Sequence, residues 1–242
     1  MRNRFIGSVF ALAAMLAFPV FTLAQNAAAP DKFDPRNLSG VWTFDTKEPR
    51  FLLTKDALPM QDWAAEKYNY NKDAEDPATR RGRNELNPDF KCFPRGPTRA
   101  WLNSEAPIEI ISTPQKLLIM FEWGGETRRI WVDGRDHPED PPLTWQGHSI
   151  GKWEGDTLVI DTIRINDYTW LDHAGHVHSD SIHLVERIRR DGDNRLILEM
   201  TIDDPMAYTK PFTVRRTFLR SRYELEPYLL CEDLLLHGKP VP

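Results

Sequence analysis

The stretch that decides the fold is GHSIGKWEGDTLVIDT, from Gly147 to Thr162. Its two halves read as short strand-like runs, 148–155 and 156–163, which meet at Gly155-Asp156. A glycine followed by a polar residue between two such runs favours a tight turn. The stretch therefore predicts a β-hairpin.

Similar runs continue on both sides of this hairpin. Segments 38–44, 107–113, 116–123 and 127–134 precede it, and segments 181–190, 194–203, 211–220 and 223–231 follow it. Turn signals separate several of them, namely Pro114-Gln115, Gly124-Gly125 and the DGDN at 191–194. The spacing of about ten residues after Cys92 predicts eight or nine antiparallel strands there, in addition to the run 38–44, arranged as an up-and-down barrel or a sandwich.

One helix is expected before these strands, over about 59–70, because Pro59 suits a first helical turn and Trp63, Ala64 and Tyr68 give a weak apolar face. The charged segment 71–87 is expected to be an exposed loop. No internal repeat or second boundary occurs, so we expect a single β-barrel domain over 38–242.

The first residues predict export. Arg2 and Arg4 precede an apolar run, 5–23, which small residues follow. This pattern is typical of a secretory signal peptide, which we place at 1–24 with cleavage after Ala24, followed by a linker over 25–37. An uncleaved anchor is the alternative, because the run is just long enough to span a bilayer. A periplasmic or secreted location follows, with no membrane contact after cleavage.

Charge excludes one class of partner. Loss of the predicted signal removes two of the 31 basic residues and leaves 29 against 36 acidic ones, a net charge of −7. Nucleic acids and anionic membrane surfaces favour basic proteins, so neither is an expected partner.

Cys92 and Cys231 are the only two cysteines. In an exported chain an even pair is most simply one disulfide, here closing nearly the whole domain. Two separate buried thiols are the alternative.

Side-chain alternation predicts the character of the barrel interior. In 181–190, Ile182, Leu184, Glu186 and Ile188 share one face. Burial raises the pKa of such a carboxyl unless a basic residue pairs with it, and Arg187 or Arg129 is the candidate partner. An apolar interior with a few titratable groups is typical of a ligand pocket.

Two resemblances add to this. The GVW at Gly40–Trp42 resembles the glycine-x-tryptophan of lipocalin-like barrels, in which the tryptophan plugs the closed end, and it implies a lipocalin-like barrel. The segments CFPRG (92–96), RRIWVDGRDHP (128–138), GHSIGKWEGDTLVIDT (147–162), TIDDP (201–205) and YLLCED (228–233) resemble a family of uncharacterised exported bacterial proteins. That resemblance implies one secreted domain with both cysteines in characteristic places, and it implies no activity.

Histidines crowd the segment WLDHAGHVHSDSIHLVER, Trp170 to Arg187. His176 and His178 would project from one face of a strand, and with His173 they could hold zinc. Asp172, Asp180, His183, His148 and His137 are further candidate ligands. Because Gly175 and short polar residues interrupt the segment, a histidine-rich surface loop without metal is the alternative.

Acid–base catalysis is the second interpretation of these histidines. Histidine has an ordinary pKa near neutrality, and a carboxylate beside it makes an acid–base unit. We expect His148, Asp172, His178 and His183 to converge at one rim of the barrel, with Glu186 or Asp161 orienting an imidazole from within the barrel. The alternative is that Asp161 serves a turn and that Glu186 pairs with an arginine.

Four tryptophans lie near these histidines in the sequence, and they are expected either in the core or around a ligand. They are Trp131, Trp145, Trp153 and Trp170, and Arg129 is grouped with them as a ligand-binding residue.

The sequence thus predicts an exported enzyme that binds a small apolar or aromatic molecule and performs cofactor-independent acid–base chemistry of a lyase, isomerase or hydratase type. The alternatives are a non-catalytic periplasmic carrier with the same pocket, and a zinc enzyme built on His176 and His178. Substrate and oligomeric state are not predicted.

Overall fold

The computed structural model describes residues 33–49, 51–72, 86–102 and 106–226. These residues belong to one compact unit that begins at Phe33. The predicted signal peptide, residues 25–32 of the predicted linker and Cys231 lie outside the described residues. Cys92 is not a free thiol, but its disulfide with Cys231 stays a prediction.

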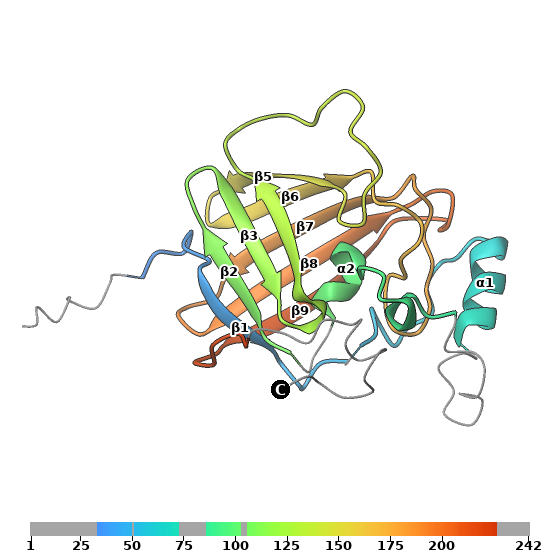
Figure 1. The fold of residues 1–242 in the computed structure, drawn as a ribbon, viewed down its shortest axis with the longest axis horizontal. Helices are drawn as coiled ribbons and strands as arrows, with labels where there is room; N and C mark the ends of the chain where they lie inside the picture. Colours follow the sequence, from blue (N-terminus) through green and yellow to red (C-terminus); the bar gives the residue numbers. More distant parts are fainter. Residues whose placement is uncertain (1–32, 50, 73–85, 103–105, 227–242) are drawn as a thin grey trace, which may run out of the picture. The chain divides into compact units, whose positions relative to one another are not determined.

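Nine strands form a closed barrel in chain order, and the last strand pairs with the first (Figure 1). The all-β prediction is therefore confirmed. The strands are β1 (Gly40–Phe44), β2 (Ile108–Ser112), β3 (Lys116–Phe121), β4 (Glu126–Trp131), β5 (His148–Glu154), β6 (Thr157–Ile163), β7 (His183–Arg190), β8 (Arg195–Asp203) and β9 (Phe212–Arg220). No strand is assigned over 223–226, the described part of the tenth predicted run.

The hairpin predicted from the opening stretch is present. Glu154 of β5 pairs with Thr157 of β6, so Gly155 and Asp156 alone form the turn. Gly155 has φ +59°, a left-handed conformation that costs glycine little. Because the turn holds only two residues, it sets the β5–β6 register along the full length of both strands.

The expectation of an entirely antiparallel barrel is wrong at one pair of strands. Ile130 and Trp131 at the end of β4 pair in parallel with Ser149 and Ile150 at the start of β5. The connection between them, 132–147, is much longer than a hairpin turn and leads the chain back to start β5 beside the end of β4 (Figure 1). Parallel neighbours need a long connection of this kind, and strand spacing in the sequence carries no information on direction.

The predicted helix is present as α1 (Asp62–Lys72), which begins at Asp62 instead of Pro59. Three shorter elements were not predicted: α2 (Gly96–Trp101) and two 3₁₀ helices, η1 (Pro88–Lys91) and η2 (Trp123–Gly125). All six residues of α2 are buried. A single turn of this kind has no periodicity for sequence reasoning to detect.

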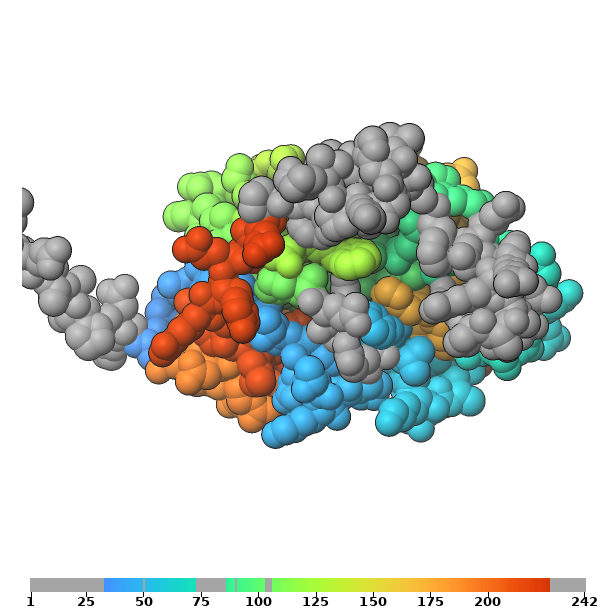
Figure 2. Space-filling view, turned by 60° about the horizontal axis from the view of Figure 1, so that its bottom comes forward, coloured from blue at the N-terminus to red at the C-terminus, as the bar shows by residue number. Residues whose placement is uncertain are grey.

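Trp42 on β1 is wholly buried, and the end-plug role that the GVW resemblance implies stays a prediction. Its Nε1 donates to the Leu38 carbonyl at 3.1 Å. The Arg220 guanidinium lies 5.2 Å from the ring centroid and donates to the Ser39 carbonyl at 3.0 Å. The segment that follows β1 then lies against β9, as the blue and red regions of Figure 2 show, where the backbone N–H of Asp45 bonds the Thr217 carbonyl at 2.9 Å.

Side chains fill the barrel interior. Trp101 of α2 enters it and contacts Phe121 and Phe218, with ring centroids 5.6 and 5.3 Å away. Ile119 and Leu198, which also point inward, are fully buried. The interior side chains that the structure describes are therefore closely packed, and the ligand pocket stays a prediction.

A buried ion pair lies in this core. Glu186 is inward-facing, as predicted, and fully buried, but its partner is Arg128 and not Arg129 or Arg187. Arg128 donates from Nη1 and Nη2 to the two carboxylate oxygens at 2.7 and 2.5 Å. The Nε1 of Trp101 donates to the same carboxylate at 2.7 Å. Burial of this pair is possible because several bonds stabilise both charges, although the buried Nε of Arg128 has no hydrogen-bond partner among the described residues.

The arginine has two further partners. Its Nη2 donates to Thr162 Oγ1 at 2.8 Å and to Ser149 Oγ at 3.2 Å. These two hydroxyls, 3.0 Å apart, point inward from β6 and β5. The polar core therefore connects β4, β5, β6 and β7 through Arg128.

We predict that Arg128→Met lowers the free energy of unfolding by about 3–5 kcal/mol, because it leaves the Glu186 carboxylate buried without its cation. The double variant Arg128→Met/Glu186→Leu should recover most of that loss, because neither charge then remains in the core. Urea unfolding of the three proteins measures both quantities. A double variant less stable than Arg128→Met would show that the pair does not act as one unit.

Candidate functional site

The outer face of β5, β6 and β7 carries a second polar group. Ser149 and Thr162 point inward, so their chain neighbours His148 on β5 and Asp161 on β6 point outward. His183, the first residue of β7, lies on the same outer face. All three side chains are partly exposed, in contrast to the sealed core behind them.

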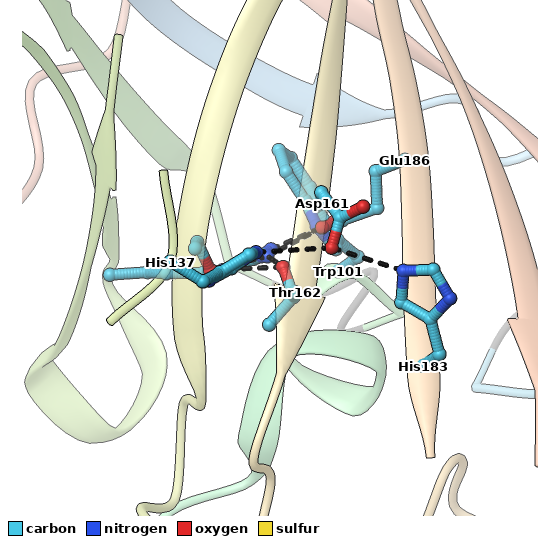
Figure 3. Close-up of polar contacts among 8 residues, drawn as sticks. Trp101, His137, Asp161, Thr162, His183 and Glu186 are labelled. Carbon is cyan, nitrogen blue, oxygen red and sulfur yellow. Dashed lines mark hydrogen bonds and ion pairs between the residues drawn. The ribbon is translucent and has the colours of Figure 1, made fainter. Parts of the chain in front are cut away.

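A carboxylate and three imidazoles make a continuous chain of hydrogen bonds here. Asp161 Oδ1 accepts from His183 Nε2 at 3.0 Å and from His137 Nε2 at 3.2 Å. His137 Nδ1 lies 2.7 Å from His148 Nδ1. Figure 3 shows His137 and His183 on opposite sides of Asp161. We call these four residues the acid–base cluster.

The neighbours of each group shift its pKa in a consistent direction. The hydrogen bond from His183 holds the pKa of Asp161 below its ordinary value, so this carboxyl is ionised. The same bond, together with the charges of Asp161 and Asp203, raises the pKa of His183. Partial burial lowers the pKa of His148, and the nearby His137 and Arg135 add to the effect. The cluster thus holds one imidazole that favours the neutral form and one that favours the cation.

The hydrogen bonds indicate which ring nitrogen carries the proton in His137 and in His148. His137 donates from Nε2 to the Asp161 carboxylate, so in its neutral form its Nδ1 is an acceptor. His148 must then donate from Nδ1, which leaves its Nε2 without a proton. Nε2 of His148 makes no hydrogen bond to any residue that the structure describes. With His137 neutral, the arrangement therefore leaves a basic nitrogen at His148.

The long connection 132–147 brings His137 into the cluster. Arg164 Nε donates to the Pro141 carbonyl at 2.7 Å, and the Thr144 N–H donates to the Arg164 carbonyl at 3.0 Å. Thr144 also forms a bridge with Ile165 just after β6. These bonds tie the second half of the connection to the end of β6, and His137 in its first half reaches over Asp161.

The predicted convergence of catalytic residues holds only in part. His148 and His183 belong to one hydrogen-bonded chain, and Asp161 bonds an imidazole from the outer face of the barrel instead of from within it. Glu186 lies in the sealed core instead. Asp172 and His178 belong to two other buried networks, described next. The segment that carries them, 164–182, is an irregular connection between β6 and β7 and not a strand.

Asp172 is a structural anchor for that connection. Its carboxylate is fully buried and accepts backbone N–H bonds from Leu53, Ala174 and His176 at 3.1, 3.0 and 3.3 Å. It also accepts from His176 Nδ1 at 2.8 Å. The His176 ring stacks on Tyr68 of α1, with centroids 4.1 Å apart. Asp172 thus holds a loop and a helix in place, away from the acid–base cluster.

His178 is likewise engaged on both ring nitrogens. Its Nδ1 donates to the Ser179 carbonyl at 2.9 Å, so its Nε2 accepts from Thr169 Oγ1 at 2.8 Å. Burial lowers its pKa, which favours the neutral ring. A side chain that is buried and doubly bonded in this way serves packing.

The three histidines of the zinc alternative do not converge. His173 accepts from Arg99 at 3.3 Å, while His176 bonds Asp172 and His178 bonds Thr169. Across the described ranges, no group of three or more His, Cys, Asp or Glu side chains is arranged to hold a metal ion.

The four tryptophans do not form one ligand surface. Trp153 points inward and packs against the core, and Trp170 is buried beneath the Arg99 guanidinium at 5.5 Å. Trp145 lies between Phe93 and Tyr168, with ring centroids 5.1 and 5.8 Å away.

Trp131 alone is close to the acid–base cluster in the sheet. It lies on the outer face of β4, and its backbone partner on β5 is Ile150, which in turn pairs with Asp161. The guanidinium groups of Arg129 and Arg135 lie 5.5 and 3.7 Å from the centre of its ring.

Sequence reasoning missed the central position of His137, which it had considered only as a remote metal ligand. The sequence does indicate that His148 and Asp161 lie together, because strand alternation places them on one face of the predicted hairpin. No such signal exists for His137, because its position depends on the path of a long loop.

Comparison with known proteins identifies no family for this chain. No protein-family profile matches the chain, and no curated protein matches it. No helix within the described ranges is long and apolar enough to cross a membrane.

Histidine burial predicts how stability varies with pH. Desolvation, with the Arg99 charge, lowers the pKa of His173 to about 3. Between this lowered pKa and the ordinary histidine pKa of about 6.5, His173 binds a proton in the unfolded state but not in the folded state. Stability attributable to His173 is therefore lost as the pH falls below 6.5, by up to about 1.4 kcal/mol per pH unit.

We predict that His173→Gln reduces the loss of stability between pH 7.5 and pH 5. His183→Gln provides the opposite case. The folded pKa of His183 is raised, so its contribution is present below about pH 6.5 and disappears as the pH rises through the folded value. Its removal should increase the acid loss. Urea unfolding at pH 7.5 and at pH 5 measures the loss of stability in each variant. An equal loss in the two variants would refute the pKa shifts assigned to His173 and His183.

Proposed function

We propose that the protein is a cofactor-independent enzyme that performs general acid–base chemistry on a small molecule at the outer face of β5–β7. The observation that carries the proposal is the hydrogen-bonded chain from His148 through His137 and Asp161 to His183. It supports an imidazole base and an imidazolium acid held on one sheet by a single ionised carboxylate.

The two end histidines have complementary roles. Neutral His148 accepts a proton at Nε2 from an acidic C–H or similar group of the substrate. Protonated His183 donates a proton to the substrate atom that gains negative charge. One proton enters the protein and one leaves it, so the reaction needs no redox partner and the substrate keeps its composition or splits into two parts. Isomerases and lyases catalyse reactions with this balance of protons and atoms.

Asp161 and His137 position these groups. A carboxylate that accepts from His183 favours the imidazolium form of that ring. His137 fixes the ring of His148 through the bond between the two Nδ1 atoms and selects the tautomer with a free Nε2. Their role parallels that of a carboxylate that orients a catalytic histidine.

A periplasmic carrier is the weaker candidate for the described part of the chain, since side chains fill the interior in which such a ligand would sit. An exported location remains part of the proposal, on the basis of the N-terminal sequence alone.

The ring opening of 5-nitrobenzisoxazole tests the proposal. A base removes the C–H proton, the N–O bond breaks, and the phenolate oxygen takes up the charge. We predict a rate that rises with pH through the lowered pKa of His148 and falls through the raised pKa of His183. His148→Gln should lower the rate about 10²-fold, because the base is lost. His183→Gln should remove the decrease of the rate at high pH, because that decrease is attributed to deprotonation of His183.

Arg187→Gln is a matched control, because Arg187 lies on the outer face of β7 but bonds Glu154 at 3.0 Å, and it should leave the rate unchanged. Dialysis against a chelator should also have no effect, whereas loss of activity would favour the zinc alternative. A wild-type rate no greater than that of free imidazole at equal concentration would contradict the proposal.

A further inference from the structure

The surface next to the acid–base cluster carries two arginines around one indole. We call Arg129, Trp131 and Arg135 the Arg–Trp strip. Arg129 and Trp131 project from the same face of β4, two residues apart, and Arg135 folds back from the following connection onto the indole. The Arg129 and Arg135 guanidinium groups are 5.5 and 3.7 Å from the centre of the indole ring.

The strip lies in line with the cluster. Trp131 pairs with Ile150, Ile150 pairs with Asp161, and Asp161 pairs with Val185. These residues therefore form one cross-strand row on the outer face, with about 5 Å between neighbouring strands. Asp161 is thus two strands, about 10 Å, from Trp131. In this row Ile150 lies between Trp131 and Asp161.

The two arginines differ in their partners. Asp133 bonds Nε and Nη2 of Arg135 at 2.9 and 2.6 Å, which fixes the guanidinium and leaves Nη1 without a bond to any described residue. Arg129 forms no ion pair within the described part of the chain. The strip therefore offers a positive charge beside a flat apolar surface.

Charge and shape together select a substrate class. A guanidinium recognises a carboxylate through paired N–H donors. An indole with an aliphatic neighbour favours a flat ring or conjugated chain. A molecule that combines the two features would lie on the strip beside the acid–base cluster.

We propose that the substrate is a small planar carboxylate, aromatic or conjugated, whose flat part lies on Trp131 and Ile150 and whose carboxylate pairs with Arg129 or Arg135. This inference rests on the acid–base function proposed above, because it places the reacting carbon next to His148. It adds the substrate class and three specificity-determining residues.

Isothermal titration calorimetry with benzoate and with neutral, isosteric benzamide tests the inference. Wild-type protein should bind benzoate about fivefold more tightly than benzamide, as expected for a partly exposed charge pair. Trp131→Leu should weaken both ligands about fivefold, because both lose the flat surface.

Arg129→Gln/Arg135→Gln should make the two affinities equal, whereas the matched control Arg187→Gln, again a paired arginine on the outer face, should keep the preference. Equal binding of benzoate and benzamide to wild type, or an unchanged preference in the double variant, would overturn the inference.

The calorimetric result separates this inference from the proposed function. Benzoate preference without any acceleration of 5-nitrobenzisoxazole opening would leave the strip as a carboxylate site and refute the acid–base role. Acceleration without benzoate preference would refute the strip and leave the acid–base role intact.

Discussion

The register of the β5–β6 hairpin is the constraint on which the rest of the structure depends. A two-residue turn at Gly155-Asp156 pairs Ser149 with Thr162 on the inner face and thereby places His148 and Asp161 on the outer face. The inner hydroxyls bond Arg128, and the outer pair belongs to the acid–base cluster. Since side chains alternate along a strand, a shift of one residue would exchange the two sets and remove both networks.

The two networks divide the chemistry of the molecule. The inner one contains a strong ion pair that four strands and α2 enclose, so it contributes to a fixed packing of the barrel and has no contact with solvent. The outer one is half-exposed and contains groups whose pKa values are shifted in opposite directions. Separation of titratable groups in this way is typical of sites that transfer protons. The Arg–Trp strip borders the outer network only.

Much of this fold could be predicted from the sequence because it follows from local patterns. Turn residues and alternation indicated the strands, the hairpin at Gly155 and the inward position of Glu186. The same alternation indicated which arginine pairs with Glu186, because Arg128 shares a face with the buried Ile130 and Arg129 does not.

The parallel β4–β5 pair and the entry of Trp101 into the barrel depend on long connections, and local patterns do not describe those. The position of His137 has the same origin. Asp172 and His178 looked catalytic because residue type alone does not distinguish a bonded structural histidine from a reactive one.

The measurement that tests the account most directly is a pH titration of the protein with 15N-labelled histidine, followed by NMR of the imidazole nitrogens. The account predicts that neutral His148 carries its proton on Nδ1 and titrates below about pH 6.5, the ordinary value for histidine. It predicts that His183 titrates above that value. A proton on Nε2 of His148, or titration midpoints in the reverse order, would contradict the assignment of base and acid.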